Sequence, residues 1–209
     1  MNKQRGRIKL TSALALGLGA LLGFAGCGAR APEATAAGQV EPAGAGGVDL
    51  SGHSFDPLAA ANGKPVVLLF LGTECPISNR YAPEIRRLHA AFAPLGVTFW
   101  LVYPEAEVSA DAVRRHLQEH ELPASALRDP QHALVRRARA RVTPEAAVFF
   151  PDGRLAYHGR IDDQFVELGV ARTVPTSHDL RDAVRAVLDG RPVARAVTRA
   201  VGCSIADPK

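Results

Sequence analysis

The chain has 209 residues, of which 47% are hydrophobic, and this is enough for one domain with its own core. The net charge of +4 arises at the start, where Lys3, Arg5, Arg7 and Lys9 precede any acidic residue. Without these four of the 25 basic residues, basic and acidic residues balance at 21 each. No basic patch interleaved with aromatic residues is present, so the composition argues against nucleic-acid binding.

Residues 1–26 are typical of a secretory signal peptide, because a basic segment precedes the uncharged stretch Leu10–Phe24. This stretch is shorter than the about 20 residues that a membrane span needs. The ending Ala25-Gly26-Cys27 resembles a lipoprotein processing site, which implies lipidation of Cys27 and a stable anchor through several acyl chains. The alternative is ordinary cleavage that leaves Cys27 free. We expect an exported, membrane-anchored lipoprotein that faces the periplasm or the cell exterior.

Composition divides the rest of the chain into three parts. Residues 27–47 are rich in Ala, Gly, Pro and Glu, which favours a disordered tether. Residues 48–195 carry the periodic apolar patterns of a folded domain. Residues 196–209 form a C-terminal tail that carries Cys203.

A cysteine stands between a predicted buried strand and a predicted helix. Val66–Phe70 is a continuous apolar run, which favours a central strand buried on both faces. Cys75-Pro76 follows after a short loop and opens a helix that we predict to run to Phe92, with a kink at Pro83. First-turn N–H groups of such a helix favour a thiolate over a thiol.

The same reading predicts the other elements of a mixed α/β sheet flanked by helices. They are a short strand within 48–55, a helical turn within 56–63, a strand at 97–103, a helix at 109–120, a strand at 126–128, a short helix at 131–140, a hairpin of 146–150 with 154–161, and a helix at 179–188.

The resemblance of this chain to a known family rests on this order of elements and on four segments, which are Phe70–Asn79, Tyr81-Ala-Pro-Glu84, Val142-Thr-Pro-Glu145 and Asp152–Asp163. The chain resembles the thioredoxin-like superfamily. The closer resemblance is to its extracytoplasmic redoxin or peroxiredoxin-like (AhpC/TSA-type) branch. It implies a three-layer sandwich, a nucleophilic Cys75 and a cis bond before Pro144 beside that cysteine. It also implies a substrate site formed by Thr73, Pro76, Thr143, Pro144 and Arg160. By their charge, Glu74 and Arg160 are candidates for tuning the pKa of the thiol, and the alternative is that both are solvated charges at the rim of the site.

The sequence departs from both familiar active-site patterns. Thioredoxins carry Cys-x-x-Cys, but here the fourth position is Ser78. Peroxiredoxins carry a threonine three residues before the cysteine and a proline seven before, but here these positions are Gly72 and Leu68. A peroxidase needs donors that stabilise the leaving oxygen, so these departures argue against fast peroxide reduction.

Three interpretations of Cys75 and Cys203 remain open. Cys203 resolves a mixed disulfide formed at Cys75, or the two cysteines form a structural disulfide, or Cys75 acts alone or binds copper together with Cys203 and a histidine such as His178. The first predicts a thiol–disulfide oxidoreductase of the cell envelope. The alternatives are a thiol peroxidase and a non-catalytic copper-binding or interaction module.

The partners that we expect are protein or small-molecule thiols and disulfides, and the membrane through the lipid anchor. We expect no cofactor. We also assign no metal site, because the histidines lack metal-ligand spacing. We interpret two further pairs, Asp162 with Asp163 and His116 with His120, as solvated.

Overall fold

The structure is a computed structural model that describes residues 46–206. The predicted signal peptide, the lipidation site at Cys27 and nearly all of the predicted tether lie outside the described residues. Among residues 46–206, no helix combines the length and the apolar character that crossing a membrane requires.

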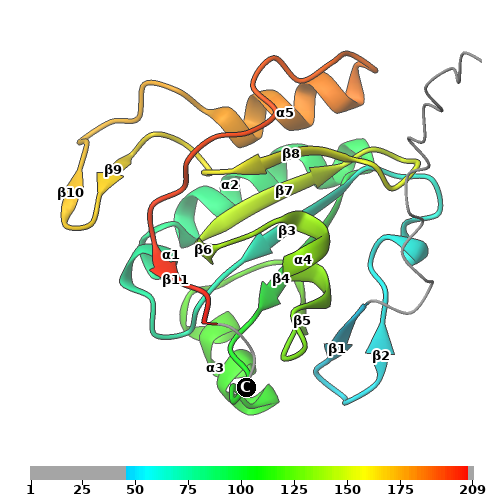
Figure 1. Ribbon diagram of the computed structural model, residues 1–209, viewed down its shortest axis with the longest axis vertical. Helices are drawn as coiled ribbons and strands as arrows, with labels where there is room; N and C mark the ends of the chain where they lie inside the picture. The colour runs from blue at the N-terminus through cyan, green and yellow to red at the C-terminus, as the bar shows by residue number, and fades with distance from the viewer. Residues whose placement is uncertain (1–45, 207–209) are drawn as a thin grey trace, which may run out of the picture. The chain divides into compact units, whose positions relative to one another are not determined.

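The centre of the fold is a seven-stranded mixed sheet with the order β2-β1-β5-β4-β3-β7-β8 (Figure 1). Its strands are β1 (Gly47–Asp49), β2 (Ser54–Phe55), β3 (Val66–Phe70), β4 (Thr98–Tyr103), β5 (Ser125–Arg128), β7 (Glu145–Phe149) and β8 (Leu155–Gly159). β3, β4 and β5 are parallel, and the remaining neighbours pair antiparallel. The predicted mixed sheet is therefore confirmed.

Strand β3 is buried along its whole length, as its composition predicts. It lies between β4 and β7, and all five of its side chains are at most 1% exposed. Val67 and Leu69 pack on one face of the sheet, while Val66, Leu68 and Phe70 pack on the other. Each buried apolar side chain of this size contributes about 1.5–3 kcal/mol. The loop that follows β3 therefore starts from a rigid point.

Helices cover both faces of the sheet. They are α1 (Pro76–Arg80), α2 (Ala82–Phe92), α3 (Ala110–Glu119), α4 (Ala133–Ala138) and α5 (Asp179–Leu188), with 3-10 turns at Ala59–Ala61 and Ala93–Leu95. The core on one face contains residues of α1, α2, α3 and α5, such as Ile85, Val113 and Val184. The core on the other face contains Leu134 and Val135 of α4.

The helix predicted to kink at Pro83 is divided into two. Tyr81 ends α1 and precedes α2, and Pro83 occupies one of the first two positions of α2. Proline fits there because the first N–H groups of a helix have no partner within it. The division lets Tyr81 turn its hydroxyl toward Asp162, to which it donates a hydrogen bond of 2.6 Å.

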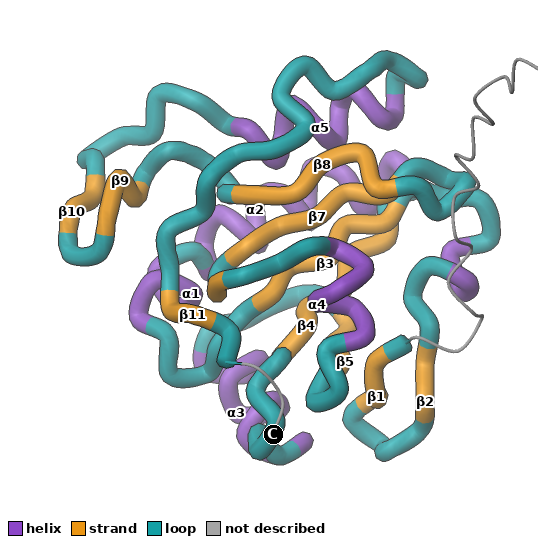
Figure 2. The backbone as a smooth tube through the Cα atoms, in the orientation of Figure 1, coloured by secondary structure: helices purple, strands orange, loops and turns teal. Residues whose placement is uncertain are grey.

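Several short elements differ from the prediction. The single strand expected within 48–55 is a hairpin of two strands, whose turn is held by the Asp49 carboxylate. The helix expected at 131–140 is limited to Ala133–Ala138, because His132 and Arg139 adopt left-handed backbone conformations at its ends. Two small sheets were not predicted. They are β9 (Phe165–Glu167) with β10 (Val170–Ala171), seen in Figure 2, and β6 (Val142–Thr143) with β11 (Cys203–Ser204), labelled in Figure 1.

Candidate functional site

Cys75 lies where the buried strand β3 gives way to α1. It precedes the first residue of the helix, with φ −83° and ψ 112°, and Pro76 starts the helix. Its side chain is 4% exposed. Strand, loop and helix therefore hold the sulfur at one position, near first-turn N–H groups, as the sequence predicts.

Two neighbours contact the sulfur of Cys75 directly. The Sγ atom of Cys75 donates to the carbonyl oxygen of Thr143 at 3.0 Å, and the peptide bond from Thr143 to Pro144 is cis, as the resemblance implies. The Sγ atom of Cys203 donates to the Sγ atom of Cys75 at 2.9 Å. Both cysteines are free thiols in this structure. The two thiols, 128 residues apart in sequence, thus share a hydrogen bond.

The tail that carries Cys203 is fixed first along the edge strand β8. The N–H of His158 donates to the carbonyl of Ala196, and the N–H of Thr198 donates back to His158. The hydroxyl of Thr198 lies 2.6 Å from the Tyr157 hydroxyl and accepts the N–H of Arg160. Glycine is required at position 159, because a Cβ there would lie 2.2 Å from the Thr198 hydroxyl oxygen.

The tail then crosses to β6, where it forms β11 (Figure 1). Cys203 pairs antiparallel with Thr143, and Ser204 pairs with Val142. A Cβ on Gly202 would lie 2.1 Å from the Thr143 carbonyl oxygen, so this close approach also requires glycine. The strand pairing therefore places the second thiol at the first by backbone geometry.

The shared hydrogen bond separates the pKa values of the two thiols. Burial raises the pKa of Cys75, but hydrogen bonds from Cys203 and Ser78 outweigh it and lower the pKa from 9.0 to about 7. The hydrogen bond to Cys75, together with burial and the nearby negative charges of Cys75 and Glu105, raises the pKa of Cys203 from 9.0 to about 11. Cys75 is therefore the thiol that ionises first.

Ser78 occupies the position of the second cysteine in a Cys-x-x-Cys motif, and here it supports the thiolate. Its side chain and its backbone N–H both lower the pKa of Cys75. It is 2% exposed, and its hydroxyl accepts the N–H of Gly72 at 3.2 Å. In the sequence Ser78 stands out only as a missing thiol, although a hydroxyl one turn into the helix is the signal that predicts this role.

Glu105 fills the space beside Gly72, where peroxiredoxins carry threonine. A Cβ on Gly72 would lie 2.8 Å from the Glu105 carboxylate oxygen, 3.0 Å from the Thr143 hydroxyl and 3.1 Å from the Cys75 Cβ. Burial raises the pKa of Glu105 even though the residue as a whole is exposed, because its carboxyl group points inward. Glu105 was not predicted from the sequence, since it lies 30 residues after Cys75 in a loop without a periodic pattern.

A cavity of about 660 Å³ opens beside the two thiols. Cys75, Thr143 and Cys203 line it, together with Glu74 and Glu105. Of the residues predicted to form the substrate site, Thr143 lies in its wall, but Thr73, Pro76 and Pro144 do not line it. Pro144 is nevertheless in the cis bond that follows Thr143.

Arg160 is directed away from this cavity. Its guanidinium donates to Asp179 at 2.7 Å and to Ser177 at 3.0 Å. These contacts join the end of β8 to α5, and Asp179 is 4% exposed. The structure therefore does not bring Arg160 to the thiols. The guanidinium is bound instead by the buried carboxylate of Asp179, which lies 19 residues further along the chain.

The acidic turn after β8 and the histidines of α3 are structural in a way that the sequence did not predict. Asp163 is 7% exposed and accepts hydrogen bonds from Thr176 and Ser177. His116 is 4% exposed, and its ring nitrogens lie 2.8 Å from the Tyr103 hydroxyl and 2.8 Å from the Asn79 side-chain oxygen. The interpretation of the two pairs as solvated is therefore wrong for Asp162, Asp163 and His116, which are 3%, 7% and 4% exposed.

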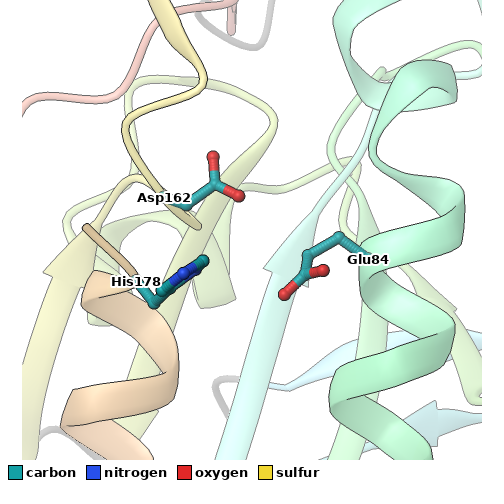
Figure 3. A group of neighbouring side chains, drawn as sticks. All are labelled: Glu84, Asp162 and His178. Carbon is teal, nitrogen blue, oxygen red and sulfur yellow. The ribbon is translucent and has the colours of Figure 1, made fainter. Parts of the chain in front are cut away.

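Glu84, Asp162 and His178 form the group of potential metal ligands within residues 46–206, with ligand atoms within 4.8 Å of one another (Figure 3). The side chains converge from α2, from the turn after β8 and from the start of α5. Glu84 is already paired with Arg87 at 2.7 Å and Arg181 at 3.2 Å. Arginines therefore already bind one member of the group, and neither thiol belongs to it.

Comparisons with solved structures support the architecture. An uncharacterized conserved protein from Geobacillus kaustophilus matches with 24% identity and a TM-score of 0.66 over 77% of this chain and 86% of that chain. A hypothetical protein from Sinorhizobium meliloti 1021 matches with 23% identity and a TM-score of 0.66, over 76% and 88%. The thioredoxin domain of a Bacteroides vulgatus thiol-disulfide oxidoreductase matches with 17% identity and a TM-score of 0.50, over 68% and 91%. These likenesses confirm the thioredoxin-like fold.

The sequence comparisons give one family. No curated protein sequence matches the chain. The model of the AhpC/TSA family matches residues 27–158, which is more than half of the chain and includes Cys75 but not Cys203. The chain therefore belongs to the AhpC/TSA family.

Proposed function

We propose that this protein is a thiol–disulfide oxidoreductase in which Cys75 is the nucleophile and Cys203 is the resolving thiol. The observation that carries the proposal is the hydrogen bond of 2.9 Å from the Cys203 sulfur to the Cys75 sulfur. The pKa of Cys75 near 7 and that of Cys203 near 11 support the division of roles, because the thiolate is the attacking form.

The reaction transfers two electrons from the enzyme to the substrate. The Cys75 thiolate attacks one sulfur of a substrate disulfide and forms a mixed disulfide, and the other substrate sulfur leaves as a thiolate that takes up a proton. Cys203 then loses its proton and attacks the sulfur of Cys75. This releases the second substrate sulfur as a thiol and leaves a Cys75–Cys203 disulfide. An external dithiol of lower potential returns the enzyme to its reduced form.

The location of this activity is part of the proposal. The signal-like residues 1–26 and the processing site at Cys27 support an exported enzyme held at a membrane by lipid. The Bacteroides vulgatus neighbour, which shares the fold, bears the name of a thiol-disulfide oxidoreductase, and this name agrees with the proposed chemistry.

Trapping experiments on the full chain test the two roles. Reduced Cys203→Ser should attack a disulfide-containing peptide once and stop as a mixed disulfide at Cys75, which mass mapping under non-reducing conditions detects. Cys75→Ser should form no adduct and show no turnover. If Cys75→Ser retained the turnover of the wild-type protein, Cys75 would not be the nucleophile and the proposal would be wrong.

A thiol peroxidase is the second candidate, and membership of the AhpC/TSA family favours it. The Cys75 thiolate would attack a peroxide oxygen, become a sulfenic acid and condense with Cys203, with loss of water. Gly72 leaves this site without the threonine hydroxyl, and the Glu105 carboxylate fills that space. We therefore expect slow consumption of hydrogen peroxide by the reduced protein. Consumption faster than disulfide exchange would reverse the order of the two candidates.

Two measurements address the other interpretations of the cysteines. A reduction potential well below about −300 mV for the Cys75–Cys203 pair would favour a structural disulfide. Titration of the reduced protein with Cu(I) tests the copper interpretation. His178 belongs to the group with Glu84 and Asp162, so we expect no tight copper complex that includes this histidine.

A further inference from the structure

The C-terminal tail covers part of the surroundings of Cys75 and so limits how a substrate can reach its sulfur. Strand β11 pairs with Thr143, and Cys203 lies 2.9 Å from the Cys75 sulfur. An incoming polypeptide therefore cannot pair with the backbone of Thr143 while the resolving thiol is in place. The approach that remains open is the cavity beside the thiols, of about 660 Å³.

Within residues 46–206, the charged side chains that line this cavity have one sign. Glu74, Glu105 and Glu107 line it, and no lysine, arginine or histidine of this described part of the chain does. Glu74 and Glu107 are exposed at the rim, whereas Glu105 turns its carboxyl group inward beside Gly72. Elsewhere in residues 46–206, buried carboxylates such as those of Glu84 and Asp179 are paired with arginines.

The same cavity offers apolar surface next to these carboxylates. Pro104, Ala106, Pro130 and Ile205 contribute to its walls. Lysine and arginine side chains bury their aliphatic stems on such surface while the charged end stays near water or a carboxylate. An anionic thiol compound of small size would instead meet three carboxylates on its way to a thiolate.

We propose that the substrates of this site are disulfides in cationic polypeptide segments, with a lysine or arginine next to the oxidised cysteine. This inference rests on the proposed thiol–disulfide exchange. The cationic side chain lies in the cavity against Glu74, Glu105 and Glu107, and the substrate disulfide reaches Cys75 through the same cavity. Charge complementarity of this kind raises the association rate more than the lifetime of the complex.

The test uses three peptides that differ only in the residues flanking one cysteine, which are lysine, glutamine or glutamate. Each cysteine is activated as a disulfide with neutral 2-thiopyridine, whose release reports attack by the reduced full chain. At low ionic strength we expect the lysine peptide to react at least about tenfold faster than the glutamate peptide. The difference should shrink to about twofold or less in about 1 M salt, where the Debye length is near 3 Å.

Substitutions then assign the preference to the cavity. The triple variant Glu74→Gln, Glu105→Gln, Glu107→Gln should lose most of the lysine-to-glutamate ratio. The ratio is the readout because these substitutions also change the reactivity of the thiols themselves. Glu119→Gln, at an exposed position of α3, is the matched control and should keep the wild-type ratio.

The outcomes separate this inference from the proposed function. If the glutamine peptide reacts in a Cys75-dependent way but lysine and glutamate peptides react equally, the charge preference is wrong and the exchange activity stands. If no peptide reacts with Cys75, the proposed function itself fails. A faster reaction of the glutamate peptide, or of glutathione disulfide than of the lysine peptide, would also overturn the charge preference.

Discussion

The two cysteines meet at one hydrogen bond, but they are held in opposite ways. Cys75 is 4% exposed and stands between a fully buried strand and a helix. Cys203 is exposed and stands on a strand of two residues that contacts the protein mainly through its backbone. The first thiol is positioned by the core, and the second is positioned by a tail. The difference indicates that nucleophilic attack and resolution can be disturbed independently.

The largest expected effect is that of Gly202→Val, which should slow resolution by Cys203 and leave attack by Cys75 in place. A Cβ at this position would lie 2.1 Å from the Thr143 carbonyl oxygen, so β11 must move away from β6. We expect release of the second substrate sulfur to slow by at least about tenfold, since about 1.4 kcal/mol of lost positioning is enough for that. Rapid-quench analysis of the mixed disulfide measures this step.

The attack by Cys75 should survive this substitution, although with a changed pH dependence. Val197→Ala is the matched control in the tail, because Val197 is 62% exposed and should leave resolution unchanged. Resolution at the wild-type rate in Gly202→Val would show that β11 does not deliver Cys203.

A smaller effect is expected at the other attachment of the tail. Thr198→Val keeps the shape of the side chain but removes the acceptor of the Arg160 N–H and the partner of the Tyr157 hydroxyl. A lost hydrogen bond of a partly buried group costs about 1–3 kcal/mol. We expect faster amide exchange at Thr198 and Cys203 and several-fold slower resolution. Unchanged exchange at Cys203 would mean that β11 is held without the contact at β8.

The hydrogen bond between the two thiols predicts how the stability of the reduced protein depends on pH. In the folded state the pKa of Cys75 is lowered to about 7, while an unfolded thiol titrates near 9.0. The unfolded state therefore binds more protons between these values, and stability rises as the pH increases from about 7 to 9. The contribution of Cys75 is on the order of 2 kcal/mol, and it is lost as the pH falls through 7.

Above pH 9 the sign reverses because of Cys203. Its folded pKa is raised to about 11, so its contribution is present below 9 and lost as the pH rises through 11. Urea unfolding of the reduced protein across this range should show greatest stability near pH 9. Cys203→Ala should reduce the rise in stability between pH 7 and 9. A wild-type profile in that variant would show that the hydrogen bond from Cys203 does not lower the pKa of Cys75.

The smallest expected effect is at Ser78. Ser78→Ala removes one hydroxyl that lowers the pKa of Cys75, but the Cys203 thiol and the backbone N–H remain. The pKa of Cys75, measured from its alkylation rate against pH, should rise by less than it does in Cys203→Ala. A larger rise in Ser78→Ala would make the helix side, rather than the tail, the main source of the lowered pKa.

The parts of the fold held by the core were predictable from the sequence. Val66–Phe70 and Asp179–Leu188 are observed within the predicted bounds, because long apolar periodicity dominates their burial. The position of Cys75 follows from the same periodicity. Pro83 predicted an irregular helix. Proline alone does not distinguish a kink within one helix from two separate helices, and the structure has two helices that meet at Tyr81.

The path of the tail was not predictable in the same way. The two-residue strands β6 and β11 have no periodicity, and their pairing requires glycine at position 202. The attachment of the tail at β8 requires glycine at position 159. The sequence brought Cys75 and Cys203 together in most of the interpretations that it left open, but it did not predict the strand pairing that joins them. Likewise, Arg160 looked available to the thiol, although Asp179 binds it, because ion pairs between distant segments leave no local pattern.

The attachment of the tail at two places also sets an effective concentration. Thr198 is fixed at β8 and Cys203 is fixed at β6, so only residues 199–202 connect them. Closing the disulfide from such a preorganised dithiol costs little further chain entropy. The intramolecular thiol then competes well against any free thiol in solution. We therefore expect the equilibrium to favour the oxidised enzyme and the reduced substrate, which makes electron donation the direction that this architecture favours.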